Sequence, residues 1–478
     1  MSLLLILVPL ACLVVLNLHF KQGFIKGAFW LGLLVILAQL AVVALLPTGL
    51  WDMRFNPLEC FFHFDASVDA ISLVVILAVG LVALATLLCA EHLIKEPKKK
   101  FYFVNLLMLV LIGLNGLALA KDLFTMYLFI EIAAIASFIL IAFRKDPLGL
   151  EGAFKYLLFS ALSSVLMLTA LSLVILFAGG TSFAAVGPAV AASAGTWPAR
   201  LALALFVCGA LIKSGVVPFH GWLPDVYTAA PTYASVLLAG IITKVSGVYV
   251  LIRLFVSVFG FDSRIDAAVM FLGAASILIG ALAALTQQNL KRLLAYSSIS
   301  QVGYIILALG CGTPLAIAGA VFHFFNHAVF KSLLFVNAAA IEQQVETQEI
   351  DALGGLSARM PVTGFTSVIG FLSAAGIPPL AGFWSKLMII LALWQAGQSG
   401  YALFALLASV LTLAYFLSLQ RRVFFGKLVP GLDGVREAGW GITTTAIILA
   451  LITVGVGVCF PFVMQGLILP IKALVVLP

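Results

Sequence analysis

The stretch Lys213-Ser-Gly-Val-Val-Pro-Phe-His-Gly-Trp-Leu-Pro-Asp225 interrupts one long apolar run, and Gly376-Ile-Pro-Pro-Leu-Ala-Gly-Phe-Trp-Ser-Lys386 interrupts another. Proline has no amide hydrogen, and its ring clashes with the preceding helical turn. Each stretch therefore predicts a broken helix, and an ordinary proline kink is the alternative.

The composition around these two stretches is that of a polytopic membrane protein. Of the 478 residues, 63% are hydrophobic and only 9% are charged, with a mean hydropathy of +1.21. So few charges cannot cover the surface of a soluble fold. A helix needs about 20 residues to cross ~30 Å of hydrocarbon. The apolar runs give about fourteen spans, of which the first lies near 2–18 and the twelfth, interrupted, near 361–396.

The two breaks also predict how the spans are organised. Broken backbone inside a membrane is tolerated only where protein or a hydrated cavity satisfies it. Paired breaks in corresponding positions of two halves are typical of inverted-repeat transporters. We therefore expect an all-α bundle with N-terminal helices in 1–98, two inverted five-helix repeats in 99–255 and 256–425, and a last helix and tail in 426–478.

The basic residues are distributed unevenly between alternate loops. Of the 26 lysines and arginines, sixteen fall in one set of loops and four inside spans. The remaining six are Arg54, Lys121, Arg200, Arg253, Arg264 and Lys472. By the positive-inside rule the richer loops are cytoplasmic, which predicts a cell-membrane protein with both termini on the outer side. This one-sided pattern, and not nucleic-acid binding, accounts for the net charge of +7.

Five ionisable groups lie within the apolar spans themselves. They are Glu131, Lys213, Lys244, Lys331 and Lys386. Each charge at membrane depth costs roughly 3 kcal/mol, so such groups are typical of ion pathways. Separating Glu131 from Lys213 would remove the charge that stabilises the protonated amine and would expel its proton. A static ion pair is the alternative. Lys213 and Lys244 lie on consecutive helices, so we expect them to converge.

A histidine stripe leads to the third of these lysines. His323 and His327 have i, i+4 spacing and share one helix face with Lys331. Because imidazole titrates near neutral pH, the stripe could relay protons through bridging waters. Structural polar contacts and ligation of haem or a metal are the alternatives.

Residues at the two breaks are candidates for access and gating. His220 and Asp225 follow Pro218, and they form either a cytoplasmic access route or a helix cap. Lys386 follows Pro378 and Pro379, which places it as a gate toward the outer side. A snorkelling lysine at a helix end is the alternative reading of Lys386. The hydroxyl-rich segment 296–301 would continue a polar path through the bundle.

These stretches resemble the proton-translocating antiporter-like subunits of respiratory complex I, Mrp-type Na⁺/H⁺ antiporters and group 4 membrane-bound hydrogenases. The runs that carry the resemblance are Lys213–Asp225, Lys244–Gly247, Leu290–Tyr304, His323–Lys331 and Gly376–Lys386. It covers roughly residues 100–425 and looks closest to the D-type subunit of Mrp antiporters. It implies a fourteen-helix bundle with two inverted repeats around a hydrophilic axis.

The resemblance also implies roles for individual residues. Glu131 and Lys213 would form the switch pair, Lys244 and the histidine helix the relay, and Lys386 the terminal proton site. The terminal site of this chain is Lys386, whereas the resemblance to the middle antiporter-like subunit of complex I would imply a glutamate there.

The function implied is H⁺ translocation within a multisubunit complex, coupled to Na⁺/H⁺ antiport or to a redox reaction in partner subunits. A subunit of a [NiFe] hydrogenase or of NADH:quinone oxidoreductase stays open, as do a haem-binding cytochrome and an inert scaffold. The sequence carries no quinone, flavin or iron–sulfur motif, and its six cysteines lack metal-ligand spacing. We therefore expect no cofactor and no metal. The expected partners are other membrane subunits, protons, Na⁺ in the antiport case and lipid, and not nucleic acid.

Overall fold

The computed structural model describes residues 3–18, 22–45, 66–193 and 196–474. Arg54 and both chain ends, for which the sequence makes predictions, lie outside these ranges. Within them the protein is nearly all helical, and the β-structure consists of isolated bridges such as Ala66 with Ala120.

The helices follow one another in this order: α1 (Leu4–Leu18), α2 (Gln22–Leu45), α3 (Ala70–Leu93), α4 (Pro97–Leu119), α5 (Leu123–Ile141), α6 (Pro147–Ala178), α7 (Phe183–Ala192), α8 (Trp197–Ser214), α9 (Trp222–Ala229), α10 (Thr232–Leu237), α11 (Val250–Arg253), α12 (Ser263–Leu285), α13 (Leu290–Cys311), α14 (Pro314–Val345), α15 (Pro361–Ala375), α16 (Ala381–Gln395), α17 (Ser399–Val423), α18 (Trp440–Val458), α19 (Phe460–Val463) and α20 (Leu469–Leu474). Short 3₁₀ turns lie at Phe219–Gly221, Ile350–Ala352 and Leu356–Ala358, and π-helical segments at Leu238–Ile242, Lys244–Tyr249, Leu254–Phe259 and Met464–Ile468.

The predicted membrane class is confirmed by the length and surface of these helices. In the described part of the chain, 12 helical runs are long and apolar enough to cross a membrane. Outer helices turn large apolar side chains such as Leu176, Phe271 and Leu407 outward, which suits a lipid environment. The predicted spans near 2–18 and 361–396 correspond to the shorter helix α1 and the pair α15 and α16. The count of fourteen spans and the two repeats stay predictions.

Both predicted helix breaks are present. Helix α8 ends at Ser214 and α15 at Ala375, and each is followed by a glycine, Gly215 or Gly376, with a positive φ. Glycine reaches this left-handed conformation without a steric penalty, so each helix stops there. A proline follows within three positions in both cases, and the chain resumes as α9 or α16.

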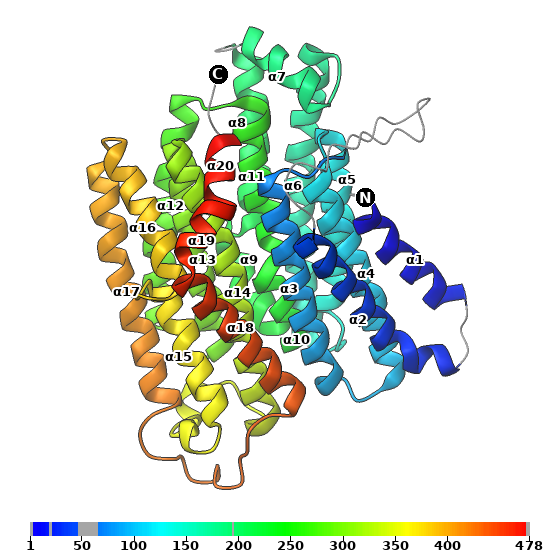
Figure 1. The fold of residues 1–478 in the computed structure, drawn as a ribbon, viewed down its shortest axis with the longest axis vertical. Helices are drawn as coiled ribbons and strands as arrows, with labels where there is room; N and C mark the ends of the chain where they lie inside the picture. Colours follow the sequence, from blue (N-terminus) through cyan, green and yellow to red (C-terminus); the bar gives the residue numbers. More distant parts are fainter. Residues whose placement is uncertain (1–2, 19–21, 46–65, 194–195, 475–478) are drawn as a thin grey trace.

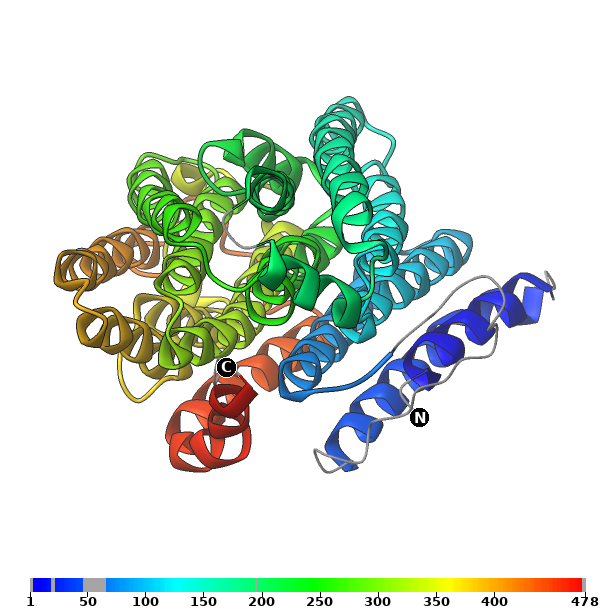
Figure 2. The same cartoon turned by 90° about the horizontal axis from the view of Figure 1, so that it is seen from above.

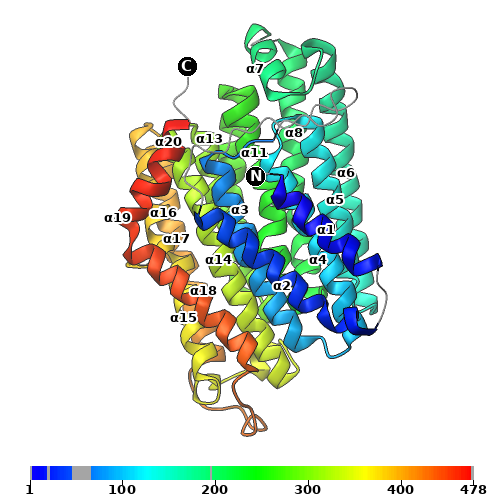
Figure 3. The ribbon, with the colours of Figure 1, turned by 45° about the vertical axis from the view of Figure 1, so that its right-hand side comes forward.

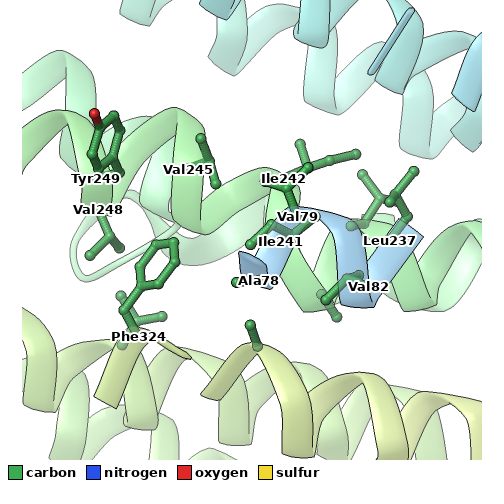
Figure 4. Packing of buried hydrophobic residues seen from close by; sticks show 14 of the residues in the cluster. Ala78, Val79, Val82, Leu237, Ile241, Ile242, Val245, Val248, Tyr249 and Phe324 are labelled. Carbon is green, nitrogen blue, oxygen red and sulfur yellow. The ribbon is translucent and has the colours of Figure 1, made fainter. Parts of the chain in front are cut away.

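The run Thr232–Phe259 forms the centre of the bundle and is almost completely buried. It contains three of the π-helical segments, which the sequence did not predict. Figure 4 shows Leu237, Val245 and Val248 from this run in one cluster with Val79 of α3 and Phe324 of α14. Two elements far apart in sequence, α3 and α14, thus pack against the helix that carries Lys244.

Peripheral helices lie around this centre. Helices α1 and α2 lie side by side along one flank, against α3 and α4 (Figure 2). Helix α18 runs obliquely across α14, α15 and α16 (Figure 3). Figure 1 places α7 at one end of the molecule and the loop between α17 and α18 at the other.

Candidate functional site

Glu131 of α5 and Lys213 of α8 form the predicted pair, with two serines of α6 between them. The Lys213 Nζ lies 3.7 Å from the Glu131 Oε1 and donates to the Ser160 hydroxyl at 2.5 Å. The Ser164 hydroxyl donates to the Glu131 Oε1 at 2.5 Å. Each charged group therefore keeps a hydroxyl partner if the long ion pair opens.

The side chain of Glu131 is more exposed than its place within an apolar span predicts. The side chain of Lys213 is 2% exposed, but that of Glu131 is 28% exposed. Its neighbours one turn away, Leu128 and Ile135, are also exposed. Glu131 therefore lies at the edge of the outward face of α5, because α5 packs against its neighbours with only one side.

Lys244 is buried in the π-helical segment Lys244–Tyr249, and its Nζ donates to the carbonyl of Ala239. Within the described ranges no hydrogen bond or ion pair joins it to Lys213. The backbones of the two helices do meet, because a Cβ at Gly247 would lie 2.5 Å from the Ser214 backbone nitrogen. The helices that carry the two lysines therefore approach closely at Gly247, and the convergence of the two ammonium groups stays a prediction.

The histidine stripe lies on one face of α14, as predicted. The rings of His323 and His327 are stacked with centroids 6.3 Å apart. His327 lies within electrostatic range of Lys244, Lys331 and Lys386. Both of its ring nitrogens are buried and have no hydrogen-bond partner among the described residues.

The stripe connects with α13 at one end and with α16 at the other. The Lys331 Nζ donates to the Leu294 carbonyl at 3.0 Å and to the Ser297 hydroxyl. The His323 Nδ1 lies 2.9 Å from the Ser385 hydroxyl. Ser385 directly precedes Lys386, which is buried just after the second break.

Lys386 is not a snorkelling lysine. Its Nζ lies 4.4 Å from the centroid of the Tyr304 ring, which favours a cation. Pro378 and Pro379 lie in the turn that separates α15 from α16, so the position of Lys386 depends on this break.

Asp225, one of the candidate residues at the first break, lines a small cavity. Pro218 lies in the turn after α8, and His220 is half-buried in the 3₁₀ turn that follows. The Asp225 carboxylate accepts from Lys155 and from Arg292, both at 2.7 Å. These three charged residues line a cavity of about 180 Å³. No side-chain hydrogen bond caps the start of α9, and the access role of Asp225 stays a prediction.

Two buried cations were missed in the sequence. Arg253, which the sequence assigned to an outer loop, is 2% exposed, and Lys291, assigned to a cytoplasmic loop, is 1% exposed. Both lie at the end of a long apolar run, where hydropathy cannot separate a loop residue from a buried one. Their acidic partners, Asp69 and Glu342, are distant in sequence, so no local signal reveals them.

Arg253 and Asp69 are the centre of a hydrogen-bond network at the N-terminal start of α3. Arg253 also donates to the Tyr249 and Ser72 hydroxyls, and Lys121 donates to Asp69 at 2.7 Å. Burial alone raises the pKa of the Asp69 carboxyl, but the charges of and hydrogen bonds from Arg253 and Lys121 outweigh it. The pKa of Asp69 is therefore held well below its usual range.

Comparison with known proteins agrees with this arrangement. Residues 120–412 match the family described as NADH:quinone oxidoreductase/Mrp antiporter, TM. The D-type subunit of the Na⁺/H⁺ antiporter of Alkalihalophilus pseudofirmus is 30% identical over 86% of this chain and 83% of its own length. The N-type subunit of the NADH-quinone oxidoreductase of Desulforudis audaxviator is 30% identical over 93% of this chain and 91% of its own length.

The fold is shared as well. A chain of the Mrp complex from Dietzia sp. DQ12-45-1b superposes with a TM-score of 0.86 at 24% identity, covering 99% of this chain and 97% of that one. The relatives are subunits of multisubunit membrane complexes. This chain therefore belongs to the NADH:quinone oxidoreductase/Mrp antiporter family, as one of its multi-pass, antiporter-like subunits.

Proposed function

We propose that this chain translocates protons within a multisubunit complex of the cell membrane. The observation that carries the proposal is the succession of protonatable side chains through the bundle, all of them buried except the partly exposed Glu131. It begins at the Glu131–Lys213 pair, continues through Lys244, His327 and His323, and ends at Lys386. A bilayer penalises each of these charges, so a row of them is retained where protons move.

Contacts support most of these roles, and the step from Lys213 to Lys244 rests on the close approach of their helices at Gly247. When Glu131 and Lys213 are close, the carboxylate stabilises the ammonium, and when they separate, Lys213 releases its proton toward Lys244. The stacked imidazoles then carry a proton along α14, with Lys331 held by α13 as a neighbouring charge. Ser385 joins His323 to the segment of Lys386, from which the proton leaves.

The coupling follows the relatives. An Mrp-type Na⁺/H⁺ antiport is the first candidate, and a redox reaction in partner subunits is the second, because both kinds of protein occur among the relatives. The loops rich in basic residues would face the cytoplasm and both termini the outside. His220 and Asp225 would then serve the cytoplasmic access to the first of two inverted repeats, divided as the sequence predicts.

The test uses the chain in its native complex, in sealed vesicles. Glu131→Ala, Lys213→Ala and Lys386→Ala should each abolish proton translocation, measured with a pH-sensitive dye, while a native gel shows normal assembly. Lys427→Ala, at an exposed lysine of the loop after α17, is the matched control and should keep full transport. Full transport in all three variants would identify the buried charges as a scaffold and reject the proposal.

A further inference from the structure

A second polar route begins at a large cavity, about 530 Å³ in volume, beside the end of α14. The cavity lies between the end of α3, the start of α4 and the start of α10. Its lining includes Lys95, Lys99 and Arg144, from the loops that the charge pattern assigns to the cytoplasm. It lies apart from the smaller cavity at Asp225, with which it shares none of its lining residues.

Glu342 of α14 is the carboxylate that joins this cavity to the interior. Its side chain is 22% exposed, so water reaches one side of it. Arg144 donates to its Oε1 at 3.1 Å, and Gln348 donates to its Oε2 at 2.6 Å. The hydroxyl of Thr232 donates to the same Oε2 from the inner side.

Behind Thr232 lies the buried Lys291 of α13. The Lys291 Nζ donates to the Thr232 hydroxyl oxygen at 3.2 Å and to the Ala230 carbonyl at 2.7 Å. Thr232 therefore accepts from an amine and donates to a carboxylate. A hydroxyl in this position can pass a proton, because it can lose one proton as it gains another.

Helix α13 carries the route onward. Leu294 lies one turn after Lys291 on the same helix, so their backbones are about 4.5 Å apart along its axis. The Leu294 carbonyl and the Ser297 hydroxyl both accept from Lys331, which belongs to the histidine stripe. Hydrogen bonds thus lead from the cavity through Glu342 and Thr232 to Lys291, and helix α13 places Lys291 one turn before the carbonyl that accepts from Lys331.

We propose that Glu342 is the proton-loading group of a second cytoplasmic access route, which enters the relay from Lys291 of α13 and is needed in addition to the Glu131–Lys213 pair. The inference rests on the proposed function. The Glu342 carboxylate takes a proton from water in the cavity. It gives that proton to the Thr232 oxygen while the Thr232 hydroxyl gives its own to the neutral Lys291 amine, which leaves a free carboxylate and an ammonium.

Several other charged or titratable groups face Glu342 and set its charge balance. Arg144 and Lys291 contribute positive charge, and Tyr233 and Cys89 lie within electrostatic range. The remaining ionisable groups of the cavity lining are Lys95, Glu96, Lys99 and Glu346. The excess of basic groups stabilises the ionised form of the Glu342 carboxylate, so the group is free of its proton at rest and holds a loaded proton only weakly.

The first test replaces the carboxylate in the native complex. Glu342→Gln keeps the size and much of the hydrogen bonding of the side chain but cannot accept the proton, and it should lower turnover at least tenfold with assembly intact. Glu349→Gln, at an exposed glutamate outside the lining of this cavity, is the matched control and should keep full turnover. Full turnover in Glu342→Gln overturns the proposal.

A second test separates proton loading from a structural role. In Glu342→Ala, millimolar formate or acetate should restore turnover severalfold, because a small carboxylic acid fits the cavity and can replace the lost group. The readout is the turnover rate of the complex and not the pH gradient across the vesicle membrane, because permeant acids collapse that gradient. A defect that these acids do not relieve assigns Glu342 a structural role and overturns the proposal.

Two further variants keep this inference distinct from the proposed function. Lys386→Ala lies far along the relay, so weak acids should not restore it, and any rescue there would show a general effect of the acids and overturn the interpretation of the second test. If Lys386→Ala and Lys213→Ala both keep full transport, the proposed function itself fails. If they lose transport while Glu342→Gln keeps it, only the second access route fails.

Discussion

The guanidinium of Arg253 donates to both carboxylate oxygens of Asp69, at 2.6 and 2.7 Å, across 184 positions of the sequence. This pair ties the end of the central Thr232–Phe259 run to the start of α3. The same run carries Lys244 in a π-helical segment, two turns before Arg253. The pair therefore fixes the element on which the relay depends.

Asp69→Asn should destabilise the protein by about 3 kcal/mol, because it leaves the buried Arg253 without its counter-charge. The midpoint of thermal unfolding of the purified complex measures the effect. Asp433→Asn is the matched control, since Asp433 is 79% exposed and lies 3.7 Å from Arg359. Exposed pairs contribute about 0–1 kcal/mol, so this variant should unfold like the wild type. Equal midpoints for both variants would contradict a stabilising role of the pair.

Acid should remove the contribution of Asp69 to stability. The folded-state pKa of Asp69 is held below its ordinary value of 3.8, so the folded protein binds this proton less readily than the unfolded chain. The stability it supplies is therefore complete above that ordinary value and is lost as the pH falls below it toward the folded-state pKa. Unfolding midpoints between pH 6 and pH 3 should fall less steeply in Asp69→Asn than in the wild type, and parallel curves would count against this linkage.

Ser160→Ala should slow proton translocation about tenfold, the effect of ~1.4 kcal/mol on a barrier. The Ser160 hydroxyl accepts from Lys213 at 2.5 Å and holds the amine while the ion pair to Glu131 is 3.7 Å long. Ser172→Ala on the same helix removes an exposed hydroxyl that bonds only its own backbone turn, and it should be neutral. Transport in sealed vesicles distinguishes the two, and equal rates would remove Ser160 from the switch.

His323→Ala should reduce translocation by about 10²-fold, the lower range for a lost proton-transfer group. Ser385→Ala should have a smaller effect in the same direction, because it removes the hydrogen-bond partner of His323 and keeps the imidazole. His92→Ala, at a histidine at the end of α3 outside the relay, is the control. Rates are compared per assembled complex, and a Ser385→Ala variant slower than His323→Ala would reverse the assigned roles.

Gly247→Ala should impair transport by pushing α8 away from the π-helical segment. The added Cβ would overlap the Ser214 hydroxyl oxygen and would lie 2.5 Å from the backbone nitrogen of the same residue. Overpacking of this kind costs about 1–3 kcal/mol. Gly455→Ala in α18 meets no atom within 4 Å and should be neutral or slightly stabilising. Unfolding midpoints and transport rates together test this, and wild-type values for Gly247→Ala would refute the close approach.

Sequence patterns predicted the parts of this protein that depend on local chemistry. The excess of apolar residues identified the membrane class, and the glycines and prolines near Lys213 and Lys386 identified both helix breaks. The i, i+4 spacing of His323 and His327 identified their common face. These features depend on composition, on backbone sterics and on helical periodicity, all of which act over a few residues.

Only the tertiary structure decided how the charges are partnered. It placed Glu131 at a surface edge, paired Arg253 with Asp69 and joined Lys291 to Glu342 through Thr232. It also showed that Lys244 lies in a π-helical segment within electrostatic range of His327. Partners of a buried charge are chosen by helix packing between segments far apart in the chain, and a single sequence carries no local trace of that choice.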